Sequence, residues 1–231
     1  MAESVPPGGT RERILDAAER LFLERGFRGA SLRELTNSAR VNLAAVGYHF
    51  GGKDELLRAV LERHVGPVNF ERLRRLDRIE ADWRAGKPRR LEPVLAALLE
   101  PAFASARSEP ESRDVTTLLF REPHERMPEL IESLFGECAR RFHAAIARAL
   151  GRADARATAL RFQMVIGAML HFLAGRHRHS RTFTGLEPEI PERVVLDELI
   201  AFLAAGLRAP ACPKVRARRA AAAADASEEA L

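Results

Sequence analysis

The chain has 231 residues, of which 46% are apolar and 30% are charged, so it is long enough for one or two domains with a sizeable core. Its formal net charge of +5 permits a polyanionic partner but is weak evidence for one, because the first 65 residues hold ten Lys or Arg against nine acids. No apolar run is long enough to span a bilayer, and the first nine residues lack the apolar segment of a signal peptide, so we expect a cytoplasmic protein with no membrane partner.

An all-α fold is the first expectation, because Leu and Ala dominate the composition and alternating strand patterns are hard to find. Residues 1–9 are expected to form a disordered arm. Residues 10–26 have the apolar spacing of an amphipathic helix, with Thr10 as its predicted N-cap and Gly26 as its predicted end.

Two short helices are predicted next. Ser31 and Glu34 have the spacing of a capping box, which opens a helix over residues 31–39. After a three-residue turn, Asn42 is expected to cap a third helix over residues 43–50.

The remaining helices are predicted from apolar spacing between Pro, Gly and acidic turns. A fourth helix starts at Lys53 and continues to about residue 83, with Pro67 as a kink that does not end it. Residues 210–231 lack a periodic apolar face, so we expect a low-complexity, disordered tail. Further helices are expected near residues 91–106, 111–121, 127–150, 153–178 and 191–208, which brings the total to about nine.

The second and third helices, joined by a tight turn and preceded by another helix, have the order of a helix-turn-helix module, whose second helix can enter the major groove of DNA. Val46 and Phe50 are expected to point inward. This leaves an outward side of small groups and one phenol: Leu43, Ala44, Gly47 and Tyr48. Small side chains let a helix approach base edges closely. A three-helix bundle within some larger helical protein is the alternative.

Roughly residues 10–57 contain a series of short signals at characteristic spacing. They are Ala-Ala-x-x-Leu-Phe in the first helix, Gly-Phe after it, a Ser before the second helix, the Val of the turn, Tyr-His-Phe, and a Lys opening the fourth helix. With these signals at matched spacing, the segment resembles the DNA-binding domain of the tetracycline-repressor (TetR-type) transcription regulators.

The resemblance implies roles in DNA binding for particular side chains. Tyr48 and His49 would donate to backbone phosphates, and Ser31 and Lys53 would contact phosphates from the starts of the second and fourth helices. The residues nearest the bases would be Leu43, Ala44, Ala45 and Gly47. For His49, a place in the core beside Phe50 is the alternative.

The residues expected nearest the bases carry no hydrogen-bonding side chain, so we expect apolar contacts, chiefly with thymine methyl groups. Arg33 on the second helix and Arg40 in the turn are the nearest guanidinium groups, and Asn42 is expected to be occupied as a cap. The rest of the sequence preference should come from groove shape and deformability.

Two positions differ from the usual pattern of the family. Arg40 stands in the turn where Gly is usual, so we expect either a non-Gly residue at positive φ, at a cost of about 1 kcal/mol, or a different turn. Gly47 stands where an aromatic residue is often found, and Gly inside a helix costs roughly 0.5 to 1 kcal/mol relative to Ala. We interpret Gly47 as a sign of close backbone approach or of a neighbour that must stay unblocked, with an unimportant replacement as the alternative.

The larger helical part must supply a dimer interface, because one short helix reads only a few base pairs and a second copy supplies the remaining specificity. The stretch from Leu160 to Gly175 is apolar nearly all round, as in a helix buried on more than one side. Gln163, Gly167 and His171 form a line of polar or small groups on it. We interpret this line as a dimer crossing; a core helix whose polar atoms are satisfied within the subunit is the alternative.

The stretch over residues 196–207 is the expected packing partner of that helix, because four-helix interfaces bury two apolar faces at once. We therefore place Leu199 and Leu203 in the dimer interface as well. By resemblance, the same helical part holds an unidentified small-molecule effector.

The sequence lacks clusters that would carry catalysis or bind metal. His171, His177 and His179 do not converge on one helix face, so we expect no metal site. Cys138 and Cys212 have no metal-ligand spacing and are expected to be ordinary thiols. Because no nucleophile with its base and no phosphate-binding Gly-rich loop is found, we expect neither an enzyme nor a cofactor.

These features predict a sequence-specific transcriptional regulator that binds a palindromic operator in double-stranded DNA as a homodimer, and acts as a repressor under the control of a small molecule. The expected organisation is a DNA-binding domain over residues 10–57, with the helix-turn-helix at about 31–50, then a regulatory and dimerisation domain over residues 58–209 and the tail. The alternative is a helical small-molecule-binding or structural protein that does not use its DNA-binding-like module.

Overall fold

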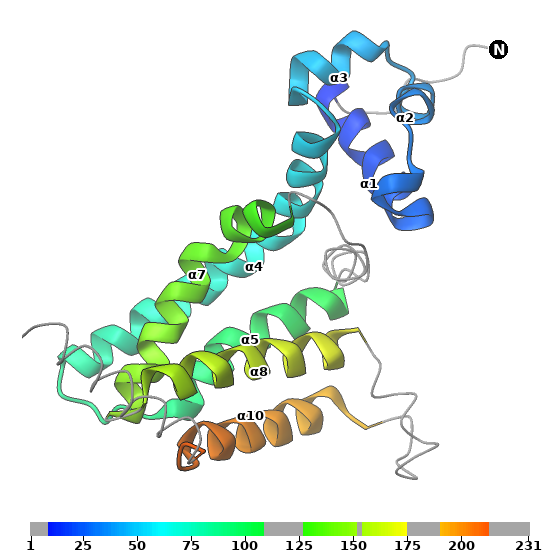
Figure 1. The fold of residues 1–231 in the computed structure, drawn as a ribbon. Coiled ribbons are helices and arrows are strands. Elements are labelled where there is room, and N and C mark those ends of the chain that lie inside the picture. Colours follow the sequence, from blue (N-terminus) through cyan, green and yellow to red (C-terminus); the bar gives the residue numbers. More distant parts are fainter. Residues whose placement is uncertain (1–8, 109–126, 152–153, 175–189, 213–231) are drawn as a thin grey trace, which may run out of the picture. The chain divides into compact units, whose positions relative to one another are not determined.

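The structure is a computed structural model, and it describes residues 9–108, 127–151, 154–174 and 190–212 (Figure 1). These residues form eight α-helices and no strand, so the predicted all-α class is confirmed. None of the helices in this part of the chain is long and apolar enough to cross a membrane. The helix predicted near residues 111–121 and most of the predicted arm and tail lie outside the described residues.

The chain divides into two compact units. The first unit consists of Met1–Glu71 and Ala102–Glu137, and the second unit consists of Arg72–Pro101 and Cys138–Leu231. Helices α4, α5 and α7 contribute residues to both units, and each unit is described below by itself.

Helices α1 (Thr10–Gly29), α2 (Leu32–Ala39) and α3 (Leu43–Phe50) pack against one another in the first unit (Figure 1). Their apolar faces form one core, with Phe22 and Val46 almost fully buried. The three predicted helices are thus confirmed, and their order is that of a helix-turn-helix module.

The start of α1 differs from the prediction. Gly9 is the N-cap, and Thr10 lies inside the helix, where its hydroxyl accepts a hydrogen bond of 3.4 Å from Arg13. Thr10 as N-cap is therefore wrong, because the helix extends one residue further than the capping signal suggests. At the other end, Gly26 has φ 74° and ψ 170°, so the regular helix stops there as predicted although the last turn runs to Gly29.

Helix α4 (Lys53–Arg84) continues past Pro67, which lies inside it as predicted. Leu56, Val60 and Leu61 on its first turns are fully buried in the core of the first unit. The start of α4 is therefore fixed by the same core that holds the helix-turn-helix.

Helix α7 (Met127–Leu150) completes that core. Leu130 is buried in it, and Leu134 packs against it from the next turn. The Asn69 side chain donates a hydrogen bond of 2.7 Å to the Leu134 carbonyl, which holds the start of α7 on α4. The first compact unit is therefore larger than the DNA-binding domain expected at residues 10–57. The end of the DNA-binding domain at residue 57 stays a prediction.

The second unit contains most of α5 (Leu91–Ser108), together with α8 (Ala155–Leu173) and α10 (Glu192–Arg208) (Figure 1). Helices α8 and α10 pack against each other, as predicted. Arg161, near the start of α8, donates hydrogen bonds of 3.0 Å to the Leu207 carbonyl and 2.6 Å to the Ala209 carbonyl at the end of α10. The two helices are therefore antiparallel.

A buried cation lies inside the second unit. The Arg72 guanidinium donates to the Leu98 carbonyl at 2.8 Å and to the Met169 sulfur at 3.3 Å. Burial lowers the pKa of Arg72, because low-dielectric surroundings disfavour the charged form. The interior of this unit is thus not purely apolar.

Candidate nucleic-acid interface

The start of α2 has the capping box that the sequence predicts. The Ser31 hydroxyl accepts a hydrogen bond of 3.2 Å from the Glu34 backbone N–H and donates one of 2.7 Å to the Glu34 carboxylate. This carboxylate also accepts from the Ser31 backbone N–H at 3.1 Å and pairs with Arg25. The hydrogen bonds from Ser31, with Arg25 beside them, lower the pKa of Glu34. A phosphate contact from Ser31 would need its hydroxyl proton to turn away from Glu34.

Arg40 forms the turn between α2 and α3 in the left-handed conformation, with φ 53° and ψ 50°. This confirms the expectation of a non-Gly residue at positive φ. Its backbone N–H donates to the Asn37 carbonyl at 3.2 Å, and its side chain is exposed. The strained turn is compact, so α3 starts within three residues of the end of α2.

Asn42 caps α3, as predicted: its side-chain carbonyl accepts a hydrogen bond of 2.9 Å from the Ala45 backbone N–H. Val46 is buried, and Ala45 and Phe50 are half-buried, so the inward side of α3 includes Ala45. Ala45 therefore lies at the edge of the outward side, and its predicted place nearest the bases has weaker support than that of Ala44.

The outward side of α3 is formed by Leu43, Ala44, Gly47 and Tyr48, which are all exposed. Tyr48 is 87% exposed and Leu43 is 60% exposed, although both have large apolar parts. A Cβ built on Gly47 would meet nothing within 4 Å, so the chain itself does not require glycine there. The outer surface of α3 thus has no partner among the described residues of the first unit.

His49 lies between the outward side and the core. It is half-buried, and its ring lies 5.1 Å from the Tyr48 ring and 6.4 Å from the Phe50 ring, in edge contacts. A phosphate contact and a packing role both fit this position, so the role of His49 stays a prediction.

Lys53 and Arg33 are two further cations of the first unit for which the sequence predicts a role in DNA binding. The Lys53 ammonium at the start of α4 lies 4.4 Å from the centre of the Phe27 ring, a cation–π contact that positions it. Arg33 is exposed on α2. The sequence alone does not point to Phe27 as the support of Lys53, because the two residues are far apart along the chain.

Three acids of the first unit form a network of ion pairs between α1 and α4. The Arg63 guanidinium lies 2.6 Å from Glu12, 2.8 Å from Asp16 and 3.1 Å from Glu19. The buried His64 side chain lies 2.9 Å from Glu19. Because these carboxylates are paired with Arg63 of α4, they repel a polyanion less than their number of negative charges suggests.

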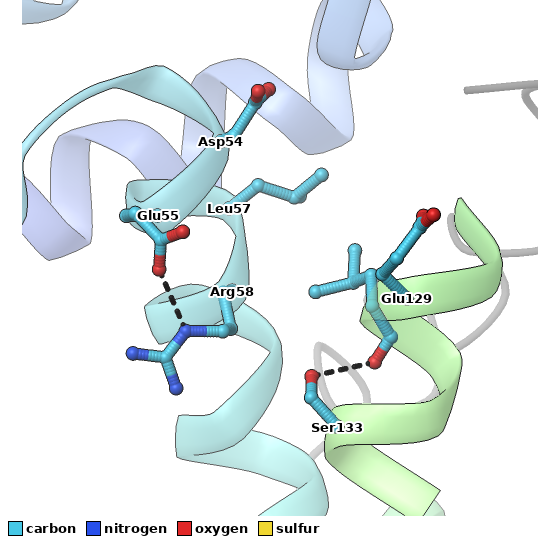
Figure 2. A pocket seen from close by; sticks show the side chains of 7 residues that line it. Asp54, Glu55, Leu57, Arg58, Glu129 and Ser133 are labelled. Atoms are coloured by element: carbon cyan, nitrogen blue, oxygen red, sulfur yellow. Dashed lines mark hydrogen bonds and ion pairs between the residues drawn. The ribbon is translucent and has the colours of Figure 1, made fainter. Parts of the chain in front are cut away.

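A hollow of about 260 Å³ lies between the start of α4 and the start of α7 (Figure 2). Leu57 and Ser133 face it, and its rim carries Asp54, Glu55 and Glu129 against one guanidinium, Arg58, which is paired with Glu55 at 2.8 Å. This excess of carboxylates disfavours a phosphate backbone. The hollow is therefore not a candidate for contact with DNA.

The residues predicted for the dimer interface divide into two sets in the second unit. Gln163, Gly167 and His171 are exposed on α8. Leu199 and Leu203 are buried within the unit, at 5% and 6% exposure, so they face the chain's own core and not a partner. The apolar pattern of the sequence thus does not distinguish these two core leucines from residues of the exposed surface.

The exposed side of α8 and α10 carries large apolar side chains that the sequence interpretation missed. Next to Gln163 and Gly167, these are Leu160, Met164, Val194 and Phe202, which are 54%, 58%, 48% and 75% exposed. An exposed patch of large apolar groups marks a binding surface in many proteins. No sequence signal separates Phe202 from the core leucines around it, because all lie in one apolar run.

Comparison with known proteins adds two family matches. Residues 14–60 match the model described as "Bacterial regulatory proteins, tetR family", and residues 96–206 match "Tetracyclin repressor-like, C-terminal domain". The first match contains the whole helix-turn-helix and the start of α4. The second contains helices of both units.

Curated relatives agree with these matches. The HTH-type transcriptional regulator BetI of Brucella suis is 30% identical over 169 residues, which are 72% of this chain and 79% of BetI. The HTH-type transcriptional regulator SrpR of Pseudomonas putida is 33% identical over 110 residues, which are 48% of this chain and 45% of SrpR. The match to SrpR thus spans about half the length of that relative.

Solved structures share the fold. FadR, a fatty acid degradation regulator from Bacillus halodurans, aligns with a TM-score of 0.60 at 17% identity over 89% of this chain and 100% of that chain. SmeT, solved as a complex with triclosan, aligns with a TM-score of 0.56 at 25% identity over 83% of this chain and 90% of that chain.

Proposed function

The chain belongs to the TetR family of DNA-binding transcriptional regulators, and on this premise we propose that it is a repressor that binds a palindromic operator as a homodimer and responds to a small molecule. The observation that carries the proposal is the outward side of α3. It is exposed, it is slim at Ala44 and Gly47, and it has no partner among the described residues of the first unit. Phosphate-binding side-chain types lie beside it at Tyr48, His49 and Lys53. This is the form of a recognition helix.

Phosphate contacts would position the module on the duplex. The exposed phenol of Tyr48 and the Phe27-supported Lys53 are the best-placed donors, with His49 between the outward side and the core. Ser31 would contribute only after its hydroxyl leaves Glu34. Base contacts would come from Leu43, Ala44 and Gly47 as apolar contacts, with Ala45 at the edge and Arg33 and Arg40 as the nearest guanidinium groups.

Homodimer formation would cover the exposed patch on α8 and α10. A second copy of this patch meets it across a two-fold axis, so its large apolar groups leave water together. Gly167 lies in the patch, and a Cβ there would meet nothing within 4 Å of the same chain, which leaves room for a partner helix. In the dimer, Gln163 and His171 would lie at the interface, whereas Leu199 and Leu203 would support it from behind.

The effector would bind among the helices of the second unit. SmeT, whose solved structure is a complex with triclosan, and FadR of Bacillus subtilis, solved with stearoyl-CoA, are regulators with this fold that bind small molecules. In this chain, the buried Arg72 provides a polar group inside a mostly apolar interior, as ligand sites usually require.

Selection from a random pool of DNA duplexes tests the proposal. The full chain should enrich a sequence with two-fold symmetry, and its affinity should fall steeply as salt is raised. The alternative, a helical protein that does not use its DNA-binding-like module, predicts no enrichment and no salt-dependent binding. Addition of hydrophobic small molecules to the enriched complex then tests the effector, which should release the DNA.

A further inference from the structure

Arg11 lies in the first turn of α1, beside the end of the recognition helix. Its guanidinium carbon is 5.2 Å from the centre of the Phe50 ring, and Phe50 is the last residue of α3. The Arg11 side chain is 57% exposed, so the contact covers one face of the guanidinium and leaves its edge in solvent. A cation over an aromatic ring is held in place without losing its hydrogen-bond donors.

The charge of Arg11 is weakly compensated. In the part of the chain that the structure describes, its carboxylate partner is Glu12 at 3.9 Å, the next residue along the helix, and that carboxylate also lies 2.6 Å from Arg63. By contrast, Arg58 lies 2.8 Å from Glu55. Arg11 is therefore a cation whose position is fixed by a ring and not by an acid.

The surroundings of Arg11 combine a row of aromatic rings with an uncapped helix start. The rings of Tyr48, His49 and Phe50 follow one another at 5.1 Å and 6.4 Å, and Arg11 extends this row from another helix. Gly9, the N-cap of α1, has no side chain to accept from the first backbone N–H groups, so the positive end of the helix dipole lies next to Arg11. By contrast, Ser31 and Asn42 cap α2 and α3.

We infer that Arg11 is a further phosphate anchor, which binds a backbone phosphate beside the one contacted by Tyr48 or His49 and thereby places the start of α1 on the DNA. The inference rests on the proposed function. A guanidinium offers two parallel N–H donors to one phosphate, and Phe50 acts as the positioning residue that aims them. The anchor extends the contact of each half-site beyond the helix-turn-helix itself.

Fluorescence anisotropy with the full chain tests the inference on two labelled duplexes, the symmetric sequence enriched by selection and a scrambled duplex of the same composition. Arg11→Ala should weaken binding to both about three- to tenfold at 0.1 M salt and lower the slope of log affinity against log salt by about one. Arg58→Ala is the matched control, because it removes the same charge from an exposed, acid-paired site of the same unit. Its slope should stay within half a unit of the wild type.

Phe50 gives a second, independent test. Phe50→Leu removes the ring and should make the later loss of Arg11 cost less than twofold, whereas Phe50→Tyr keeps the ring and should preserve the full effect of Arg11→Ala. Thermal melting identifies any variant that fails to fold. If a Phe50 variant fails to fold, the comparison of Arg11→Ala with Arg58→Ala still tests the inference.

An Arg11→Ala slope equal to that of Arg58→Ala would overturn the inference, as would lost affinity for the symmetric duplex alone. If the wild type itself binds neither duplex in a salt-dependent way, the proposed function fails, a result distinct from failure of the Arg11 anchor.

Discussion

The outward sides of α3 and of α8 with α10 are both exposed and both carry apolar groups, yet they differ in how open the helix backbone is. On α3, Ala44 and Gly47 leave a slim stretch between the large side chains Leu43 and Tyr48, whereas Met164 and Phe202 make the patch on α8 and α10 bulky. A groove in DNA admits a slim helix and offers few apolar surfaces, whereas a second protein chain can bury large groups at about 25 cal/mol per Å². The difference in bulk therefore separates a surface suited to DNA from one suited to protein.

The largest expected effect comes from placing a charge in the bulky patch. Phe202→Glu should break the homodimer, with a cost on the order of 2 kcal/mol or more, because a carboxylate would be buried in an apolar interface. Sedimentation should show monomers, and operator affinity should collapse while affinity for random DNA falls less. Ala81→Glu adds the same charge at an exposed site of α4 and should stay dimeric. A Phe202→Glu dimer with normal operator affinity would assign this patch another role.

Removing a cation beside the slim surface should have the next largest effect. Lys53→Ala should weaken binding to operator and random DNA alike by about 1 kcal/mol and reduce the salt slope by about one, because phosphates carry no sequence information. Tyr48→Phe should act in the same direction. Lys87, paired with Asp82 at 2.8 Å in the second unit, supplies the control Lys87→Ala. Loss of operator preference at constant affinity for random DNA would show that Lys53 reads bases.

A methyl group on the slim surface should separate stability from binding. Gly47→Ala should stabilise the free protein by about 0.5 to 1 kcal/mol, because alanine favours the helix and its Cβ meets nothing within 4 Å. Operator affinity should nevertheless fall, because the methyl would stand between the α3 backbone and the bases. Gly66→Ala on α4, whose Cβ also meets nothing within 4 Å apart from its chain neighbours, should bind normally, although Pro67 directly after it should make its stabilisation smaller. Unchanged operator affinity in Gly47→Ala would make this glycine an unimportant replacement.

The smallest effect concerns single methyl groups of the DNA. Replacing thymine by uracil at one or two half-site positions should weaken binding by a fraction of the roughly 1 to 3 kcal/mol typical of a mismatched pair. Arg33→Ala should relax the preference for a guanine. Tolerance of uracil at every position, together with an equal loss of all affinities in Arg33→Ala, would contradict apolar reading by α3. Competition titrations measure both effects, with duplexes that differ only in thymine against uracil for the first and only in the guanine position for the second.

The sequence predicts features that depend on neighbouring residues. The capping box at Ser31, the cap at Asn42 and the helix end at Gly26 are local hydrogen-bond and backbone preferences, and the structure has all three. Arg40 at positive φ was expected because the turn has the same place in related chains, and the strain is present.

Features that depend on distant packing were not predictable. Leu199 and Phe202 stand in the same apolar run, yet one is buried and the other is 75% exposed, because the rotation of α10 is set by α8. The contact of Arg11 with Phe50 and the network of Arg63 with α1 likewise join residues far apart in sequence. Periodicity shows that a helix has an apolar face but not which of two partners covers it.

The place of Leu130 in the first core has a consequence for the order of folding. During synthesis, α1 to α3 and the start of α4 leave the ribosome first, but α7 follows only after the rest of α4 and α5 have been made. Until then, the core of the nascent first unit lacks the side chains of α7. The contact of α7 with that core joins residues far apart in sequence, and such contacts are slow to form. Both units share the helices α4, α5 and α7, so neither reaches its finished form before the other has largely been made.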